Sequence, residues 1–333
     1  MSYLDGDCDR ADPASLLEGA ASLVVVALPH PAADGTRSTT AGLPVAAFAL
    51  GRDYHVLIQE KLSVLAQAAA DLSGRPVRAR ACVDTAPLLE RAAAQKAGIG
   101  FIGHNTMLIV PGFGSRVTLG TLVLDLALAS DPPLSVGCEN CDACIRACPT
   151  GALLEPFTLD ARRCVSYLTI ESSGLVPTAL RPLMGRRLFG CDACQDVCPH
   201  NAAATDSPPA AAHDPAPELG PWNPSDVLAH GSSQHRRLVR GTTLRRVSRN
   251  RLARNAAVAL GNGRDPDAAA ALIRAVEQHP SGLVRAHAAW ALGRLADASC
   301  RSALERAAAA DPDADVRAEA AKALQHAQRH PES

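Results

Sequence analysis

Residues 138–149 read Cys-Glu-Asn-Cys-Asp-Ala-Cys-Ile-Arg-Ala-Cys-Pro, and this run decides how the middle of the chain must fold. Its cysteines, Cys138, Cys141, Cys144 and Cys148, have the spacing C-x2-C-x2-C-x3-C-P. In this pattern three thiolates hold one [4Fe–4S] cluster and the fourth reaches a second cluster. Because the short spacers wrap the chain around a cluster, we expect little regular periodicity here.

A second run supplies further thiolates. Cys191, Cys194 and Cys198 follow the spacing C-x2-C-x3-C-P and add three ligands to the four of the first run. Two clusters need eight ligands, and Cys164, between the runs, is the natural eighth. The pseudo-symmetry of the runs assigns Cys138, Cys141, Cys144 and Cys198 to cluster one, and Cys148, Cys164, Cys191 and Cys194 to cluster two.

Zinc is the rival interpretation, since zinc sites also use C-x2-C pairs. A zinc site does not need the closely spaced third and fourth cysteines or the proline after each run, so the pattern favours clusters. Three of the eleven cysteines, Cys8, Cys82 and Cys300, remain and are expected to be ordinary thiols.

The composition limits the classes of protein that the chain can represent. It has 333 residues, 47% hydrophobic residues and a net charge of −1, which excludes a disordered chain and allows two or three domains. No apolar run approaches the roughly 18 residues of a membrane span. The first residues are acidic and lack the pattern of a secretory signal, so we expect a cytoplasmic protein whose cysteines bind metal rather than form disulfides.

The hydrophobic pattern divides the chain into segments. Residues 1–130 are predicted to form an α/β domain, with strands at 23–28, 77–83, 99–110 and 117–128 and helices at 52–72 and 87–97. Residues 131–205 form the predicted ferredoxin-like two-cluster insert. A proline-rich linker is expected at 206–225.

The last segment, residues 226–330, contains an internal repeat. Residues 252–261 recur at 284–293 and again at 316–324, with the same offset of 32 residues. Alanine-rich helices at this period are typical of an α-solenoid of HEAT-like repeats, in which each pair buries its apolar face on the next.

The start of this segment is strongly basic. From Val227 to Arg264 there is no Asp or Glu, and there are nine arginines. A charge run is ordinarily a solvated helix face, but these charges are uncompensated, which favours contacts with RNA phosphates. The candidates are Arg236, Arg237, Arg240, Arg245, Arg246, Arg249, Arg251 and Arg254.

Several motifs together resemble those of the epoxyqueuosine reductases, which use cobalamin and act on tRNA. They are residues 51–55 (GRDYH), 82–91 (CVDTAPLLER), 98–106 (GIGFIGHNT), the first cysteine run, 160–171 (DARRCVSYLTIE), 189–195 (FGCDACQ) and 254–262 (RNAAVALGN). The resemblance implies that the epoxide of epoxyqueuosine at the tRNA wobble position is reduced to the alkene of queuosine. Electrons would pass through the clusters to a cobalamin in an N-terminal corrinoid-binding domain.

The resemblance also implies roles for single residues. Asp84, in the Val-Asp-Thr motif, would be the proton donor. Cobalamin contacts are expected at Phe48, Asp84, His104, Asn105, Leu108, Ser115 and Ser166. A low-potential donor of the ferredoxin or flavodoxin type would supply electrons to a monomeric enzyme.

The residues alone leave alternatives open at these positions. Asp84 precedes a predicted helix, where an Asp is most often an N-cap. The glycines of residues 98–105 suit a close approach to a planar ligand, although a tight turn is the commoner reason for such glycines. Tyr54 and His55 begin an amphipathic helix, where packing or a surface position is the default interpretation.

The chain also departs from the family pattern. It begins several dozen residues late, and Phe48, Ala86, His104 and Thr121 stand where the family has tyrosine, glycine, lysine and glutamate. These departures lie in or near the expected corrinoid pocket. They keep three alternatives open: a dehalogenase-like corrinoid reductase, a ferredoxin-like electron carrier with a HEAT-type docking arm, and an RNA-binding protein with structural clusters.

Overall fold

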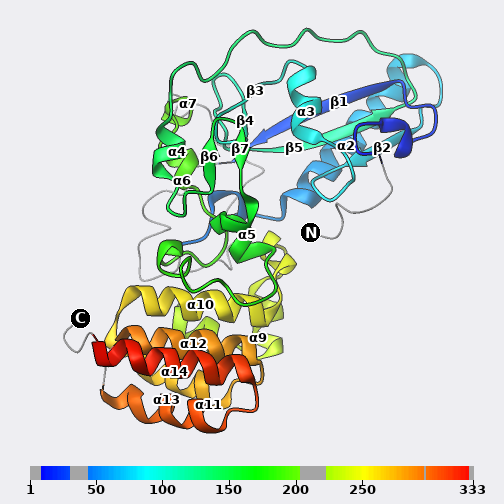
Figure 1. Cartoon of the computed structure of the whole chain (residues 1–333). Helices are drawn as coiled ribbons and strands as arrows, with labels where there is room; N and C mark the ends of the chain where they lie inside the picture. The colour runs from blue at the N-terminus through cyan, green and yellow to red at the C-terminus, as the bar shows by residue number, and fades with distance from the viewer. Residues whose placement is uncertain (1–8, 31–43, 203–222, 296–297, 330–333) are drawn as a thin grey trace. The chain divides into compact units, whose positions relative to one another are not determined.

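The fold was analysed in a computed structural model, which describes residues 9–30, 44–202, 223–295 and 298–329 (Figure 1). The chain forms two compact units. Ala47–Asp160 is the main part of the first unit, and Ala161–Cys191 and Pro217–Ser333 belong to the second. The segment expected to be a cluster insert is therefore divided, because Asp192–Ala216 returns to the first unit. Most of the expected linker, and Cys8, lie outside the described residues.

A three-stranded antiparallel sheet forms the base of the first unit. Its order is β1 (Ser22–Pro29), β5 (Val117–Leu124) and β2 (Ala79–Cys82). The predicted strands in these regions are confirmed, with β5 ending earlier than expected.

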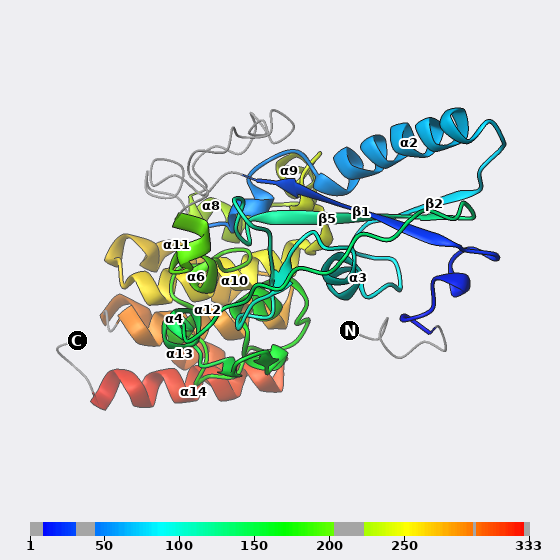
Figure 2. The same cartoon turned by 90° about the horizontal axis from the view of Figure 1, so that it is seen from above.

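Two helices cover this sheet because side chains alternate along β5. Leu122 and Leu124 pack with α2 (Tyr54–Ser73), which runs beside the strands in Figure 2. Leu119 packs instead with α3 (Glu90–Lys96). Gly120 lets α2 approach closely, since a Cβ there would lie 2.2 Å from Ile58 Cγ2.

Short elements carry the cysteines of the first unit. The expected strand at 99–110 is two short strands, β3 (Phe101–Ile102) and β4 (Leu108–Ile109), joined by a tight turn. The first cysteine run leads into α4 (Ala143–Ala147), which β6 (Leu153–Glu155) and β7 (Thr158–Leu159) follow; the second run forms α6 (Ala193–Asp196) and α7 (Pro199–Ala202). The low periodicity predicted for this region reflects these one-turn helices.

The second unit is helical. Its elements are α5 (Val165–Ile170), α8 (Pro224–Ala229), α9 (Ser232–Leu238), α10 (Arg249–Gly263), α11 (Ala269–Gln278), α12 (Gly282–Leu295), α13 (Ala298–Ala310) and α14 (Ala314–Arg329). The three predicted repeat copies are α10, α12 and α14, stacked in this order in Figure 1.

Glycines at equivalent repeat positions allow this stacking. A Cβ on Gly261 would lie 2.8 Å from Ala291 Cα, and one on Gly293 would lie 2.8 Å from Ala323 Cα. Successive helices therefore pack almost backbone to backbone, as a solenoid of small residues requires.

Candidate functional site

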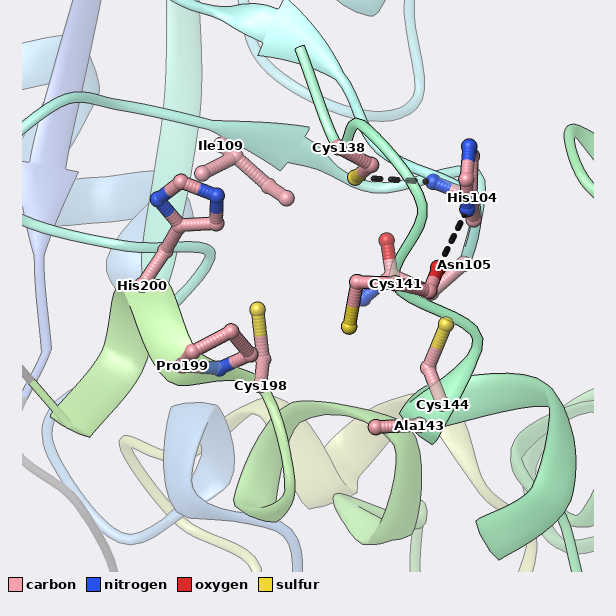
Figure 3. Close-up of a pocket in the computed structure, with 10 residues that line it drawn as sticks. All are labelled: His104, Asn105, Ile109, Cys138, Cys141, Ala143, Cys144, Cys198, Pro199 and His200. Carbon is pink, nitrogen blue, oxygen red and sulfur yellow. Dashed lines mark hydrogen bonds between the residues drawn. The ribbon is translucent and has the colours of Figure 1, made fainter.

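The first unit brings the four cysteines assigned to cluster one around a single cavity (Figure 3). Cys138, Cys141 and Cys144 come from the loop before α4 and from its first turn, and Cys198 directly precedes α7. The cavity has an apolar lining that includes Ile109. Four thiols around an apolar cavity suit a [4Fe–4S] cluster, in which each iron takes one thiolate.

Backbone and ring groups surround these thiols. The His104 N–H donates to Cys138 Sγ at 3.4 Å, and His104 Nδ1 donates to the Cys141 carbonyl at 2.7 Å. Burial raises the pKa of the Cys138 thiol, and the His104 N–H opposes this shift. The Phe157 ring lies edge-on to His104, with ring centroids 5.0 Å apart.

The cysteines assigned to cluster two are divided between the units. Cys148 and Cys194 belong to the first, and Cys164 and Cys191 to the second. Burial acts to raise the pKa of the Cys148 thiol, but backbone N–H groups and the Thr150 hydroxyl outweigh it, so this pKa is lowered. The Ala152 N–H donates to Cys148 Sγ at 3.2 Å. This environment favours a thiolate at Cys148.

The remaining described cysteines are buried thiols. Cys82 is 1% exposed and Cys300 is 2% exposed. All ten cysteines in the described part of the chain are free of disulfides. The expectation that Cys82 and Cys300 are ordinary thiols is consistent with this burial.

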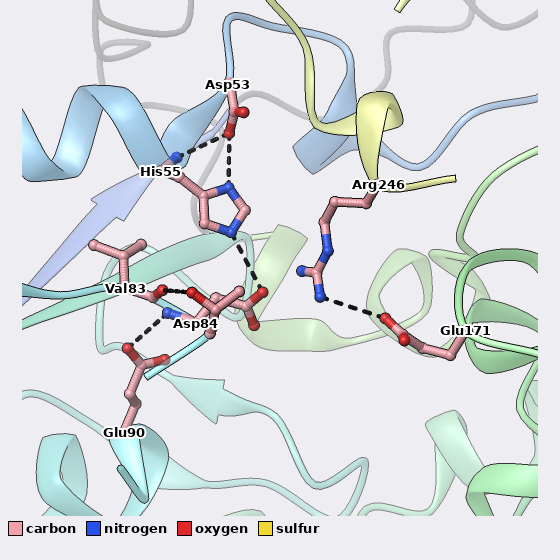
Figure 4. A network of polar contacts seen from close by, with 8 residues as sticks. Asp53, His55, Val83, Asp84, Glu90, Glu171 and Arg246 are labelled. Carbon is pink, nitrogen blue, oxygen red and sulfur yellow. Dashed lines mark hydrogen bonds and ion pairs between the residues drawn. The ribbon is translucent and has the colours of Figure 1, made fainter. Parts of the chain in front are cut away.

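Asp84 lies in a strained turn after β2 (Figure 4). Its φ is +52°, and the Thr85 N–H donates to the Val83 carbonyl at 2.5 Å across it. Such a conformation costs a non-glycine residue about 1–3 kcal/mol and is typical of functional sites. The N-cap alternative for Asp84 is wrong, because α3 begins only at Glu90, with Leu89 as its N-cap.

Glu90 holds the backbone of this turn. Its Oε1 accepts the Asp84 N–H at 2.9 Å. Burial raises the pKa of the Glu90 carboxyl to about 7, although the bond from Asp84 acts in the opposite direction. The Asp84 side chain is 41% exposed.

His55 connects Asp84 to the start of α2. Its Nδ1 lies 2.7 Å from Asp53 Oδ1 and its Nε2 lies 3.4 Å from Asp84 Oδ2 (Figure 4). Asp53 also caps α2 by accepting the His55 N–H at 3.1 Å. Burial acts to lower the pKa of His55, but the hydrogen bonds to Asp53 and Asp84 outweigh it and raise this pKa to about 9.

This role of His55 is not predicted by the sequence pattern. Tyr54 and His55 are expected from it to be packing or surface residues of an amphipathic helix. Tyr54 is indeed buried and stacks on the His55 ring, with centroids 4.1 Å apart. The signal available was an Asp two residues before a His at a helix start, where one carboxylate can bind both the backbone and the imidazole.

Four of the seven expected cobalamin contacts are occupied in other ways. His104 and Asn105 line the cavity of cluster one. Leu108 packs in the core with Val25 and Ala94, and the buried Ser115 hydroxyl is hydrogen-bonded to Gln195 and Asn201. The assignment of the seven residues to cobalamin stays a prediction. Phe48 lies edge-on to Tyr54.

The glycines before Asn105 also serve the fold. A Cβ on Gly100 would lie 2.3 Å from the Ile109 carbonyl oxygen, and one on Gly103 would lie 2.5 Å from Ile109 Cδ1. Close packing on β4 gives a structural reason for Gly100 and Gly103, and the approach to a planar ligand stays a prediction.

The arginines expected to contact tRNA differ in their exposure to solvent. Five are exposed, while Arg249 and Arg251 are half-buried; the exposed ones are Arg236, Arg237, Arg240, Arg245 and Arg246. Arg246 Nη2 lies 3.5 Å from Glu171 Oε1.

Arg254 corrects the expectation for this segment. It is fully buried, and its guanidinium donates to the carbonyls of Leu168, Ser172 and Gly174 at 2.5–2.9 Å. Burial, with repulsion from Arg251 and Arg181, lowers its pKa to about 10. A group enclosed in this way cannot contact a phosphate, so the assignment of Arg254 to tRNA was wrong.

Three family models match along the chain. They are described as epoxyqueuosine reductase QueG, DUF1730 (residues 10–85), 4Fe-4S double cluster binding domain (137–201) and HEAT repeats (243–325). The cluster cavity and the helical repeats therefore define the class: a double-cluster iron–sulfur protein with a HEAT-repeat unit.

Curated relatives specify the family. An epoxyqueuosine reductase of Salmonella typhimurium is 41% identical over 264 residues, which cover 76% of this chain and 66% of that protein. One of Pseudomonas aeruginosa is 40% identical over 290 residues, covering 84% and 78%. A crystal structure of epoxyqueuosine reductase with an epoxyqueuosine-modified tRNA-Tyr stem loop has a TM-score of 0.87 at 32% identity, covering 96% and 85%. The chain belongs to the epoxyqueuosine reductase family.

In the described residues, no helix is long and apolar enough to cross a membrane.

Proposed function

We propose that this chain reduces epoxyqueuosine in tRNA to queuosine. The epoxide oxygen leaves as water, so the reaction consumes two electrons and two protons for each nucleoside. Two [4Fe–4S] clusters carry electrons one at a time, which suits delivery from a low-potential donor of the ferredoxin or flavodoxin type.

The observation that carries the proposal is the strained Asp84 turn beside His55 in a member of this family. Asp84 is the proposed proton donor to the departing oxygen. His55 carries a proton at neutral pH and contacts Asp84 Oδ2, so it can return a proton to Asp84 after each transfer. Asp53 and Glu90 keep this pair in place through the ring and the backbone.

We include cobalamin because the family resemblance implies it, and when bound it would supply the chemistry that breaks the carbon–oxygen bond. The residues that the resemblance assigns to cobalamin stay predicted contacts.

The cluster ligands in this proposal are the eight cysteines of the two runs and Cys164. The proposed tRNA contacts are the exposed Arg236, Arg237, Arg240, Arg245 and Arg246, with Arg249 and Arg251 at their margin. The segment from Val227 to Arg264 has charges but no Phe, Tyr or Trp to stack on bases, so it would position the tRNA backbone rather than read its sequence. A tRNA substrate implies a cytoplasmic protein, and we propose that it acts as a monomer.

Complementation tests the function directly. The chain is expressed in a bacterium that lacks its own epoxyqueuosine reductase, and the tRNA nucleosides are measured by mass spectrometry. We expect queuosine to replace epoxyqueuosine. Persistent epoxyqueuosine, with the protein present and its iron retained, would favour an electron carrier instead.

A further inference from the structure

Asn105 lies in the turn between β3 and β4 and lines the cavity of cluster one (Figure 3). Asn105 is 5% exposed. Asn105 Oδ1 accepts the Met107 N–H at 3.1 Å, which determines which end of the amide is the nitrogen. Asn105 Nδ2 is buried and has no hydrogen-bond partner within the described residues.

A buried amide donor without a partner is destabilising, so such a group indicates a missing acceptor. The acceptors that this cavity would contain are the sulfide ions and cysteine sulfurs of cluster one. The preceding residue already donates in this way, because the His104 N–H bonds to Cys138 Sγ.

Hydrogen bonds within the turn hold the two donors, the His104 N–H and Asn105 Nδ2, in place. The Gly103 N–H donates to the Met107 carbonyl and the Thr106 N–H to the Gly103 carbonyl, each at 2.8 Å. Thr106 has a φ of +64°, and Arg91 donates to its carbonyl. These bonds, with the one from the Met107 N–H to Asn105 Oδ1, fix the position of the amide in the turn.

We propose that Asn105 Nδ2 donates a hydrogen bond to a sulfur of cluster one and thereby raises the reduction potential of this cluster relative to cluster two. Reduction adds negative charge to the cluster, and a hydrogen bond to its sulfur stabilises that charge. The difference between the two potentials would then favour electron residence on cluster one. The inference rests on the double-cluster domain and does not depend on the tRNA reaction.

The test is a potentiometric EPR titration of the cluster-loaded full chain without tRNA. Asn105→Ser removes the amide donor, while its hydroxyl can still accept the Met107 N–H. We expect the ratio of reduced to oxidised cluster one at a given potential to fall about tenfold, a shift of about 59 mV for one electron. Cluster two should not shift. Asn140→Ser changes an exposed asparagine between Cys138 and Cys141; it is the matched control and should shift neither cluster.

A second measurement uses the wild-type chain and so does not depend on how the variant folds. Asparagine labelled with ¹⁵N only at the side-chain amide is incorporated, and pulsed EPR of reduced cluster one is recorded. We expect a ¹⁵N coupling that Asn140→Ser keeps. Absence of this coupling, or an unchanged potential in an Asn105→Ser protein that retains its iron, would overturn the proposal. Either result would leave the proposed tRNA reaction untouched.

Discussion

At the scale of single residues, Asp84 is the position where strain and chemistry coincide. The conformation at φ +52° is retained because Glu90 binds its backbone N–H and His55 contacts its carboxylate. A side chain held in an unfavourable conformation by two separate partners is consistent with a role that depends on its exact placement.

Replacing Asp84 tests this role. We expect Asp84→Asn to lower the single-turnover rate of queuosine formation by about 10²–10⁴-fold, the usual contribution of a general acid. Iron content should stay at about eight per chain, since Asp84 is not a cluster ligand. Quenched-flow samples analysed by mass spectrometry give the rate. An unchanged rate would remove Asp84 as the proton donor.

The charge of His55 gives a prediction about pH. Because the pKa of His55 in the folded chain is raised from 6.5 to about 9, the imidazolium stabilises the fold fully below pH 6.5, and this contribution is lost as pH rises through 9. NMR titration of ¹⁵N-histidine should therefore find the His55 midpoint near 9. In Asp84→Asn the midpoint should fall, because one of the two anionic partners is gone.

Other titrating groups near His55 determine the pH range in which the NMR titration should be interpreted. Asp53 and Asp84 both raise its pKa, and Glu90, near them, titrates at about 7. Measurements above pH 7.5 therefore separate His55 from Glu90. A midpoint near 6.5 in the wild type would contradict the hydrogen-bonded geometry.

Sequence reasoning reached some residues of the site and missed others for identifiable reasons. Spacing alone grouped Cys138, Cys141, Cys144 and Cys198, which the structure gathers around one cavity, because cluster ligation constrains local spacing strongly. His55 could not be identified in the same way, since its contact with Asp84 joins residues 29 positions apart through a turn conformation that propensities do not encode.

At the scale of elements, the helical repeat was predictable and the function of its arginines was not. The constant offset of 32 residues between the three sequence copies indicates repeated helix pairs directly. In the sequence, the arginines form a single charged stretch. In the structure, Arg254 lies on the buried side of α10, while Arg245 precedes this helix and is exposed. Whether a charge in a helix meets water or a carbonyl depends on the packing partner of that helix.

This difference predicts opposite effects for two substitutions. Arg245→Ala should weaken tRNA binding and reduce the slope of log K against log salt by about one. Arg254→Met should leave carbonyls of the 168–174 segment without donors and lower the melting temperature. Filter binding at several salt concentrations and thermal unfolding measure the two effects.

The matched pair also defines what would contradict this assignment. If Arg254→Met changed the salt slope and left the melting temperature unaltered, the buried assignment of Arg254 would be wrong. If Arg245→Ala left the slope unchanged, the exposed arginines would not be phosphate contacts.

At the scale of the whole molecule, the order of segments along the chain was predictable but their grouping was not. An α/β segment, a cysteine region and a helical repeat follow one another as expected. Yet the chain passes to the second unit at Ala161 and returns to the first at Asp192, so compact units and linear segments differ. Such interleaving depends on long-range contacts, which local patterns do not specify.

The central claim, that this chain is an epoxyqueuosine reductase in activity as well as in family, is tested most directly with purified protein. The chain is loaded anaerobically with its clusters, supplied with cobalamin and a low-potential reductant, and given epoxyqueuosine-containing tRNA; nucleosides are then quantified. We predict conversion to queuosine that depends on added cobalamin and on the reductant. Unchanged epoxyqueuosine from a chain that holds about eight irons and binds the tRNA would contradict the claim.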